Sequence, residues 1–197
     1  FPTRRSSDLN NDIEVITPDW IQEMLMFAQR SDVGAVGAML YYPDDTIQHA
    51  GVILGIGGVA GHAHKNLLRG DYGYMSRATI AQNLSAVTAA CMMVSHNVWN
   101  QVHGLDETYE VAFNDVDLCM RICEAGYLIV WTPYAELYHY ESKSRGYEDT
   151  PEKKWRFEGE VRRFQERWKK ELAEGDPHYN PNLTLDREDF SIKRENE

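Results

Sequence analysis

The stretch GLDETYEVAFNDVDLCMRICEAGYLIVWTP (residues 104–133) carries the strongest fold signal in the chain. Its segment from Asn114 to Glu124 has helical periodicity, acidic residues in the first turn, and Gly126 at the position of a C-cap. Residues 127–132 follow directly, are rich in β-forming side chains, and are stopped by Pro133. A helix that leads straight into an apolar strand is typical of an α/β fold.

The segments on either side continue this alternation. Thr17 as N-cap and Pro18 at the first helical position predict an amphipathic helix over residues 18–29. A short helix is predicted at residues 98–102, and loops at residues 55–61 and 62–84. Further strands are predicted in four runs: residues 33–42, 46–54, 85–95 and 136–140.

A long charged helix is predicted over residues 151–172, with one apolar stripe and an otherwise solvated face. The stripe consists of Phe157, Val161, Phe164, Trp168 and Leu172. Together the elements predict an α/β fold in which helices flank a mixed sheet and a helical tail ends the chain.

Composition narrows the possible functions. The 197 residues suit one domain with an appendage, and 43% apolar residues suffice for a core. A net charge of −11 argues against a nucleic-acid partner, which requires a basic face. Membrane helices need roughly 18–20 apolar residues, and no such run is present. Three cysteines cannot all pair, and with no secretory signal at the N-terminus they predict a reduced, cytoplasmic protein.

Two polar clusters are candidates for chemistry. Asn10, Asn11 and Asp12 follow a strand end, and their oxygens suit a hard divalent cation that also binds phosphate; an ordinary Asx-rich turn is the alternative. Asp115 begins the helix at 114–124. The helix dipole alone would favour an acid there, but a carboxylate held at the end of an apolar helix also suits a general base.

Histidines provide further candidates. His139 ends a strand and could complete a metal site begun by Asp12, although a structural histidine is the commoner case; Ser144 and Arg145, just beyond it, could hold phosphate. His62 and His64 alternate, which on a strand would place both rings on one face. A substrate-facing loop is preferred there over a zinc site.

These motifs, in this order, resemble the family-two glycosyltransferases with a GT-A fold, notably bacterial enzymes of O-antigen and related polysaccharide assembly. The resemblance extends from about Leu9 to Phe190. Its segments are LNNDIEVITPDWIQEML, TIQHAGVILG, AVTAACMMV, GLDETYEVAFNDVDLCMRICEAGYLIVWTP, LYHYESKSRG and DPHYNPNLTL.

The resemblance implies a role for each matching residue. Asp12, with Asn10 as a weaker ligand, occupies the metal-binding DxD position, and His139 matches a histidine that contacts the metal or the diphosphate. Asp115 falls at the catalytic base, where Asn114 replaces the usual Glu. The implied metal is Mn²⁺ or Mg²⁺. Ser144 and Arg145 are assigned to the donor diphosphate, and acceptor binding is assigned to Asp106, Glu107, Asp117, His62 and His64.

Members of this family begin with a βαβ half that binds the nucleotide, and this half is not recognisable here. Residues 1–8 are expected to be a disordered leader foreign to the family, residues 9–150 the catalytic and acceptor portion, and residues 151–197 the helical tail. The chain is therefore expected to be the C-terminal portion of the enzyme and to be inactive by itself.

The implied function is inverting, metal-dependent transfer of a hexosyl-type sugar from a nucleotide-diphosphate donor to a saccharide or lipid-linked acceptor in cell-surface polysaccharide synthesis. A cytoplasmic location is expected, with peripheral association at the inner face of the membrane left open. Two alternatives stay open: an inactive, carbohydrate-binding remnant, and a metal-dependent hydrolase using His62, His64 and His139.

Overall fold

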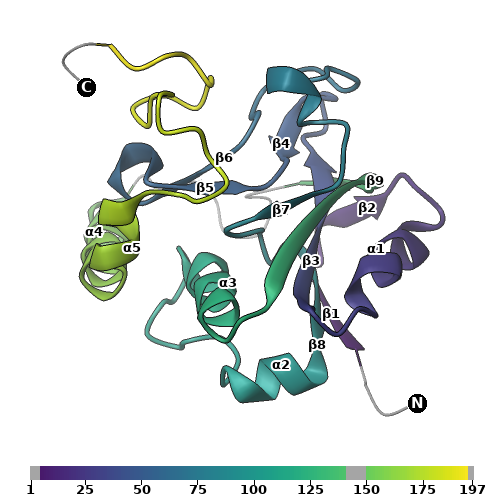
Figure 1. Ribbon diagram of the computed structural model, residues 1–197, viewed down its shortest axis with the longest axis horizontal. Helices are drawn as coiled ribbons and strands as arrows, with labels where there is room; N and C mark the ends of the chain where they lie inside the picture. Colours follow the sequence, from purple (N-terminus) through teal and green to yellow (C-terminus); the bar gives the residue numbers. More distant parts are fainter. Residues whose placement is uncertain (1–4, 141–149, 195–197) are drawn as a thin grey trace.

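A mixed seven-stranded sheet forms the centre of the molecule (Figure 1). The computed structural model describes residues 5–140 and 150–194. The sheet has the order β1-β8-β3-β9-β2, with β4 added to β3 and β7 to β9. Among the described strands only β3 and β9 pair in parallel. Its strands are β1 (Arg5–Leu9), β2 (Ile13–Val15), β3 (Val33–Tyr41), β4 (Ile47–His49), β7 (Gln82–Leu84), β8 (Cys91–Ser95) and β9 (Leu128–His139). A separate pair is formed by β5 (Val52–Leu54) and β6 (Ala60–His62).

Helices cover both faces of the sheet, which confirms the predicted α/β class. In Figure 1, α1 packs on one side of β3 and β9 and α3 on the other, with α4 and α5 outside α3. The α-helices are α1 (Trp20–Ala28), α2 (His96–Gln101), α3 (Asn114–Glu124), α4 (Pro151–Arg167) and α5 (Lys169–Glu174). Two short 3₁₀ turns are η1 (Ile56–Gly58) and η2 (Tyr74–Ser76). None of the helices in the described ranges is long and apolar enough to cross a membrane.

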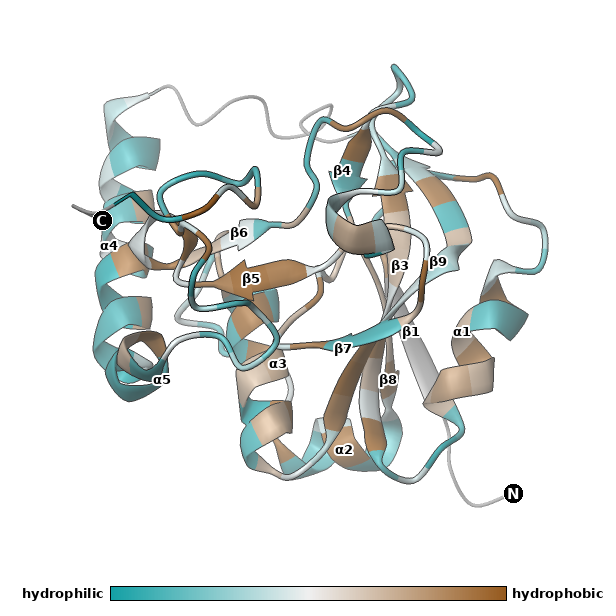
Figure 2. Cartoon of the chain, turned by 45° about the horizontal axis from the view of Figure 1, so that its top comes forward, coloured by the Kyte–Doolittle hydropathy of each residue, from teal (hydrophilic) through white to brown (hydrophobic). Residues whose placement is uncertain are grey.

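The cores lie on the two faces of β3. All nine residues of this strand are buried, as its continuous apolar run predicts for a strand covered on both sides (Figure 2). Met24 and Ala28 of α1 pack on one face. Trp131, Phe164 and Trp168 belong to the larger core on the other face, and each buried side chain of this kind stabilises the fold by roughly 1.5–3 kcal/mol.

The predicted helix at 114–124 and the strand at 33–42 are confirmed almost residue for residue. Gly126 adopts the left-handed conformation expected after a helix, with φ +89°. The start of α1 differs, because Asp19 rather than Thr17 is its N-cap. The Thr17 hydroxyl instead accepts a hydrogen bond from the Glu136 backbone N–H at 3.1 Å, and so ties the chain entering α1 to β9.

Strand β9 corrects a second prediction, since Pro133 lies inside it rather than ending it. The register between β3 and β9 shifts between Gly37 and Met39, whose partners are Trp131 and Glu136. Pro133 falls in the resulting irregularity, where its missing N–H costs no ladder hydrogen bond. The strand therefore continues to His139.

Other predicted elements are shorter than expected. The run at 46–54 divides into β4 and β5 at Gly51, whose φ of +99° turns the chain. Within 85–95 only Cys91–Ser95 is a strand, and the helix predicted over 151–172 is divided at Trp168. The glycine-rich segment at 55–61 folds into η1 and the start of β6.

The expectation that residues 1–8 form a disordered leader is wrong for residues 5–8. Arg5–Leu9 form β1, which pairs antiparallel with β8 from Arg5↔Ser95 to Leu9↔Cys91. A polar sequence can form such a strand because backbone groups make the ladder, and β1 pairs with one neighbour only. Strand β1 therefore supports the turn that carries Asn10 and Asp12.

The space around Gly37 in β3 and Gly159 in α4 predicts that substitution by alanine changes stability in opposite directions at the two positions. A Cβ on Gly37 would lie 2.5 Å from Val87 Cβ, so Gly37→Ala should destabilise the fold by about 1–3 kcal/mol. A Cβ on Gly159, inside α4, meets nothing within 4 Å, so Gly159→Ala should stabilise it by about 0.5–1 kcal/mol. Urea unfolding followed by circular dichroism measures both changes. Equal effects of the two substitutions would contradict this account of β3.

Candidate functional site

The segment Thr88–Ala90, directly before β8, is hydrogen-bonded to three different parts of the chain. The Thr88 N–H faces His49 Nε2 at 3.4 Å, and the Ala89 N–H donates to Asp115 Oδ2 at 3.0 Å. The Ala90 carbonyl accepts from the Asn10 N–H at 3.1 Å. These backbone contacts bring Asn10, His49 and Asp115 together although they are distant in sequence.

Asp12 and His139 meet at the edge of the same region. Strands β2 and β9 pair in antiparallel register from Ile13↔His139, and the Asp12 carbonyl accepts from the Tyr140 N–H at 2.9 Å. Asp12 Oδ1 consequently lies 3.3 Å from His139 Nε2. The predicted convergence of these two side chains is thus present in the structure.

The side chains fit a divalent cation. Asp12 Oδ1 is buried and has no hydrogen-bond partner among the described residues, and it lies beside an imidazole nitrogen; a positive charge close to both atoms would satisfy them. Asn10 Nδ2 lies 3.2 Å from the same nitrogen. Within residues 5–140 and 150–194 there is no group of three or more His, Cys, Asp or Glu side chains that could hold a metal. A site with one carboxylate and one imidazole leaves coordination positions for water and phosphate oxygens, as is usual for Mg²⁺ bound by proteins.

Asp115 is held rigidly at the start of α3. Its Oδ1 accepts from the Val116 N–H at 2.8 Å and its Oδ2 from Ala89, while Asn114 Oδ1 accepts from the Asp115 N–H at 2.7 Å. Phe113 precedes the helix in the left-handed conformation, with φ +65°. The carboxylate is half-buried and ionisable at the rim of the region that contains Asn10.

Asp117, which was assigned to acceptor binding, lies in the core. Two residues correspond to about 200° around a helix, so Asp117 faces away from Asp115 and into the core. Its side chain is completely buried and accepts hydrogen bonds from Arg121 Nε at 2.8 Å and Trp168 Nε1 at 3.0 Å. Arg167 Nε lies 3.2 Å away. Asp117 therefore joins α3 to the end of α4.

Asp106 and Glu107, also predicted to bind the acceptor, lie in the turn between α2 and α3. Asp106 Oδ1 accepts from the Thr108 N–H and hydroxyl, and Oδ2 pairs with Arg167 at 2.8 Å. The Thr108 hydrogen bonds, with Arg167 adding to them, lower the pKa of Asp106. These bonds tie the turn to α4. The neighbouring Glu107 is exposed.

His62 and His64 do not share a face. Strand β6 ends at His62, and His64 has φ +59°, so the alternation of a strand is lost between them. His62 Nδ1 lies 2.9 Å from His49 Nδ1, whereas the buried His64 ring stacks on Phe190 at 4.4 Å between centroids. The His64 ring, which was assigned to acceptor binding, is therefore packed in the core against Phe190 and does not share a face with His62.

Two residues of this region, Gln48 and His49, were not identified as candidates from the sequence. Gln48 and His49 lie in β4, where an apolar run made the whole segment resemble a core strand. Burial, followed by the charges of His62 and His139, holds the pKa of His49 well below its usual value. The only signal in the sequence was a pair of polar residues inside an apolar run.

Ser144 and Arg145, predicted to hold the donor diphosphate, lie outside the described residues.

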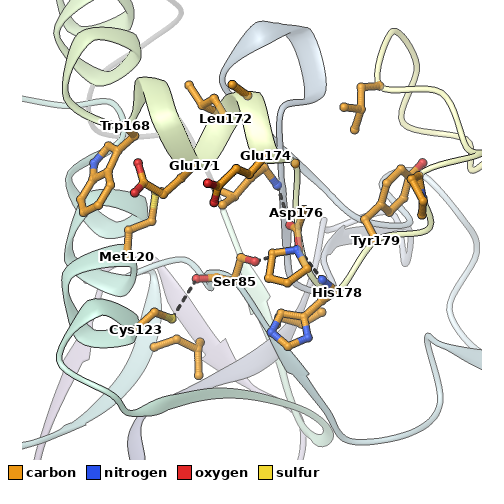
Figure 3. Close-up of a pocket in the computed structure, with 18 of the residues that line it drawn as sticks. Ser85, Met120, Cys123, Trp168, Glu171, Leu172, Glu174, Asp176, His178 and Tyr179 are labelled. Atoms are coloured by element: carbon orange, nitrogen blue, oxygen red, sulfur yellow. Dashed lines mark hydrogen bonds between the residues drawn. The ribbon is translucent and has the colours of Figure 1, made fainter.

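A large cavity lies elsewhere in the described structure. It has a volume of about 840 Å³ and lies between α3, α5 and the segment after α5 (Figure 3). Asp176 stands in its wall and accepts from the Ser85 hydroxyl at 2.7 Å and the Leu54 N–H at 2.8 Å. None of the predicted site residues lines it. Asp176 and its partners anchor the C-terminal segment to the domain.

The chain is similar to known proteins over most of its length. A family model described as "Glycosyltransferase like family 2" matches residues 9–167. The chain is 56% identical over 186 residues to the uncharacterised protein y4gI of Sinorhizobium fredii. This match covers 93% of the present chain and 20% of the length of y4gI. It is 37% identical over 194 residues to the O-antigen biosynthesis protein RfbC of Myxococcus xanthus, covering 94% of this chain and 14% of that protein.

A shorter match concerns the N-acetylglucosaminyl-diphospho-decaprenol L-rhamnosyltransferase of Mycobacterium tuberculosis. It is 38% identical over 60 residues, which cover 30% of this chain and 20% of the enzyme. The chain thus spans about a fifth or less of the length of each of these relatives. The mixed sheet with helices on both faces is consistent with a GT-A-like domain.

The environment of His64 predicts how stability depends on pH. Burial, with the charge of Arg77 adding to it, lowers the pKa of His64 from 6.5 to about 4. Between these values the unfolded chain binds a proton that the folded chain does not, so the free energy of unfolding should fall as pH decreases through this window. His64→Phe keeps an aromatic ring on Phe190 and removes the proton, so it should reduce this slope.

Urea unfolding at several pH values between 7 and 4.5, each with its own linear extrapolation, measures the slope. His96→Phe, at an exposed position of α2, is the matched control and should leave the slope unchanged. A slope that is the same in His64→Phe and in the wild type would show that His64 does not titrate as described.

Proposed function

We propose that this chain, which belongs to glycosyltransferase family 2, takes part in the inverting transfer of a sugar from a nucleotide-diphosphate donor to a saccharide or lipid-linked saccharide acceptor. The observation that carries the proposal is the close approach of Asp12 and His139, together with the hydrogen bonds by which Asn10 and Asp115 are both attached to Thr88–Ala90. Asp12 Oδ1 lies 3.3 Å from His139 Nε2. Asp115 accepts a hydrogen bond from the Ala89 N–H, and the next residue, Ala90, accepts one from the Asn10 N–H.

In this proposal Asp12 and His139 hold a divalent cation, with Asn10 beside them. A bound Mn²⁺ or Mg²⁺ would neutralise the negative charge that the diphosphate gains as it leaves. The buried, unpartnered oxygen of Asp12 supports this assignment, because a buried carboxylate oxygen is costly unless something compensates it. Ser144 and Arg145 are proposed to bind the same diphosphate, on the sequence alone.

Asp115 is proposed as the general base. Its carboxylate would take the proton from the acceptor hydroxyl as that oxygen attacks the anomeric carbon. The two backbone N–H groups on it fix its position and leave its outer lone pairs for a hydroxyl. One base without a protein nucleophile gives a single displacement, and a single displacement inverts the anomeric centre.

The acceptor is proposed to lie beside Asp115. Glu107 and His62 are the remaining candidates for its hydroxyl groups, because His64 and Asp117 are turned into the core and Asp106 is bonded to Thr108 and Arg167. The names of two relatives refer to O-antigen biosynthesis and to a diphospho-decaprenol substrate. They support a role in cell-surface polysaccharide synthesis, carried out in the cytoplasm and, for a lipid-linked acceptor, at the inner face of the membrane.

The assignment of Asp115 predicts a loss of chemistry without a loss of fold. In an active enzyme that carries this segment, Asp115→Asn should reduce turnover by about 10²–10⁴, because the amide cannot take up the proton. The Asn side chain can still accept one backbone hydrogen bond, so the free energy of unfolding should fall by no more than about 1 kcal/mol. Release of nucleoside diphosphate from the donor sugar, measured with acceptor present, reports turnover.

Glu124→Gln, at the far end of the same helix, is the matched control and should keep full turnover. Near-normal turnover in Asp115→Asn would remove Asp115 from the role of base. Loss of turnover in both variants would show that the assay reports damage to α3 rather than the chemistry.

A further inference from the structure

Gln48 of β4 and His139 of β9 form a paired contact that is almost fully buried. Their exposed fractions are 5% and 8%. Gln48 Nε2 donates to the His139 backbone carbonyl at 3.2 Å, and Gln48 Oε1 lies 2.6 Å from His139 Nδ1. One side chain therefore contacts both the backbone and the ring of the same residue.

This geometry determines which ring nitrogen carries the proton. A backbone carbonyl only accepts hydrogen bonds, so the amide NH₂ of Gln48 must face it and the amide oxygen must face the ring. Because that oxygen also only accepts, Nδ1 of His139 must be protonated. In the neutral ring Nε2 is then an acceptor, in agreement with the Asn10 Nδ2 donor 3.2 Å from it.

The proton position matters at the other side of the ring. Nε2 lies 3.3 Å from Asp12 Oδ1, and with Nδ1 protonated the neutral ring has no hydrogen on Nε2 to donate to that oxygen. In the opposite tautomer, Nε2–H would donate to Asp12 and satisfy the buried oxygen directly. That hydrogen bond would remove both atoms from cation binding.

We propose that Gln48 is a positioning residue that keeps His139 in the Nδ1–H tautomer, so that Nε2 is an acceptor, which a divalent cation beside Asp12 Oδ1 can bind in place of the Asn10 amide. Its importance for sugar transfer rests on the metal site of the proposed function. The tautomer itself does not, because it follows from hydrogen bonds within the chain. Outer partners of this kind usually change metal affinity by about 10–100-fold when they are removed.

The test compares three substitutions in the full, untagged chain. Gln48→Met has a similar shape and removes both hydrogen bonds, whereas Gln48→Glu keeps an oxygen that accepts from Nδ1–H. Thr132→Val, a buried isosteric change on the same strand β9, is the matched control. Nitrogen-15 NMR at about pH 8, where imidazole is neutral, identifies the protonated ring nitrogen; the His139 signals are assigned by their loss in His139→Asn. Calorimetry measures Mn²⁺ binding, and circular dichroism checks the fold.

The expected result is an Nδ1–H ring at His139 in the wild type, in Thr132→Val and in Gln48→Glu. In Gln48→Met the ring should change to Nε2–H, and Mn²⁺ should bind about 10–100-fold more weakly than in the wild type. An Nε2–H ring in the wild type, or an Nδ1–H ring in folded Gln48→Met, would overturn the proposal.

Failure of the proposed function gives a different pattern. If the wild type binds no Mn²⁺ while its His139 has the Nδ1–H tautomer and Gln48→Met has the other, the positioning role of Gln48 stands and the metal site is refuted. If Mn²⁺ binds equally to the wild type and to Gln48→Met, Gln48 has no influence on the site and the proposal is wrong.

Discussion

The backbone of Thr88–Ala90 is the constraint on which the candidate site depends. These residues precede β8 and do not join the ladder of the sheet, yet buried backbone groups must be hydrogen-bonded. They obtain their partners from His49, Asp115 and Asn10, which lie in β4, in α3 and in the turn after β1. The same contacts that satisfy the segment therefore bring together side chains from three parts of the chain.

The periodicity of the helix explains how two acids in neighbouring positions serve different purposes. Asp115 and Asp117 are separated by about 200° on α3, so one lies at the rim and the other in the core. Asp117 is compensated there by Arg121, Arg167 and Trp168, as a buried carboxylate must be. The outer helix α4 is thus joined electrostatically to the helix that positions Asp115.

Local signals predicted part of this arrangement. The apolar run of β3 and the capped pattern of α3 follow from periodicity alone, and the resemblance to a family supplied Asp12, Asp115 and His139 as candidates. Sequence could not predict the contact of Gln48 with His139, because β4 and β9 approach only through the tertiary fold. It also misplaced Pro133, since a register shift is a property of two strands together. Sequence also could not predict that Asp117 is buried, because an acid near a helix start has the same sequence signal at the rim and in the core.

The central claim, that Asp12 and His139 hold a divalent cation in the region that also contains Asp115, is tested most directly by paramagnetic relaxation. Mn²⁺ broadens the NMR signals of nearby amides, and Mg²⁺ serves as the diamagnetic reference. The account predicts that low concentrations of Mn²⁺ broaden the amides of Asp12, Ala89, Ala90 and Tyr140 first, while those of Trp168 and Asp176 beside the large cavity stay sharp. Broadening centred on the acids near α5, or spread without preference over the acidic surface, would contradict it.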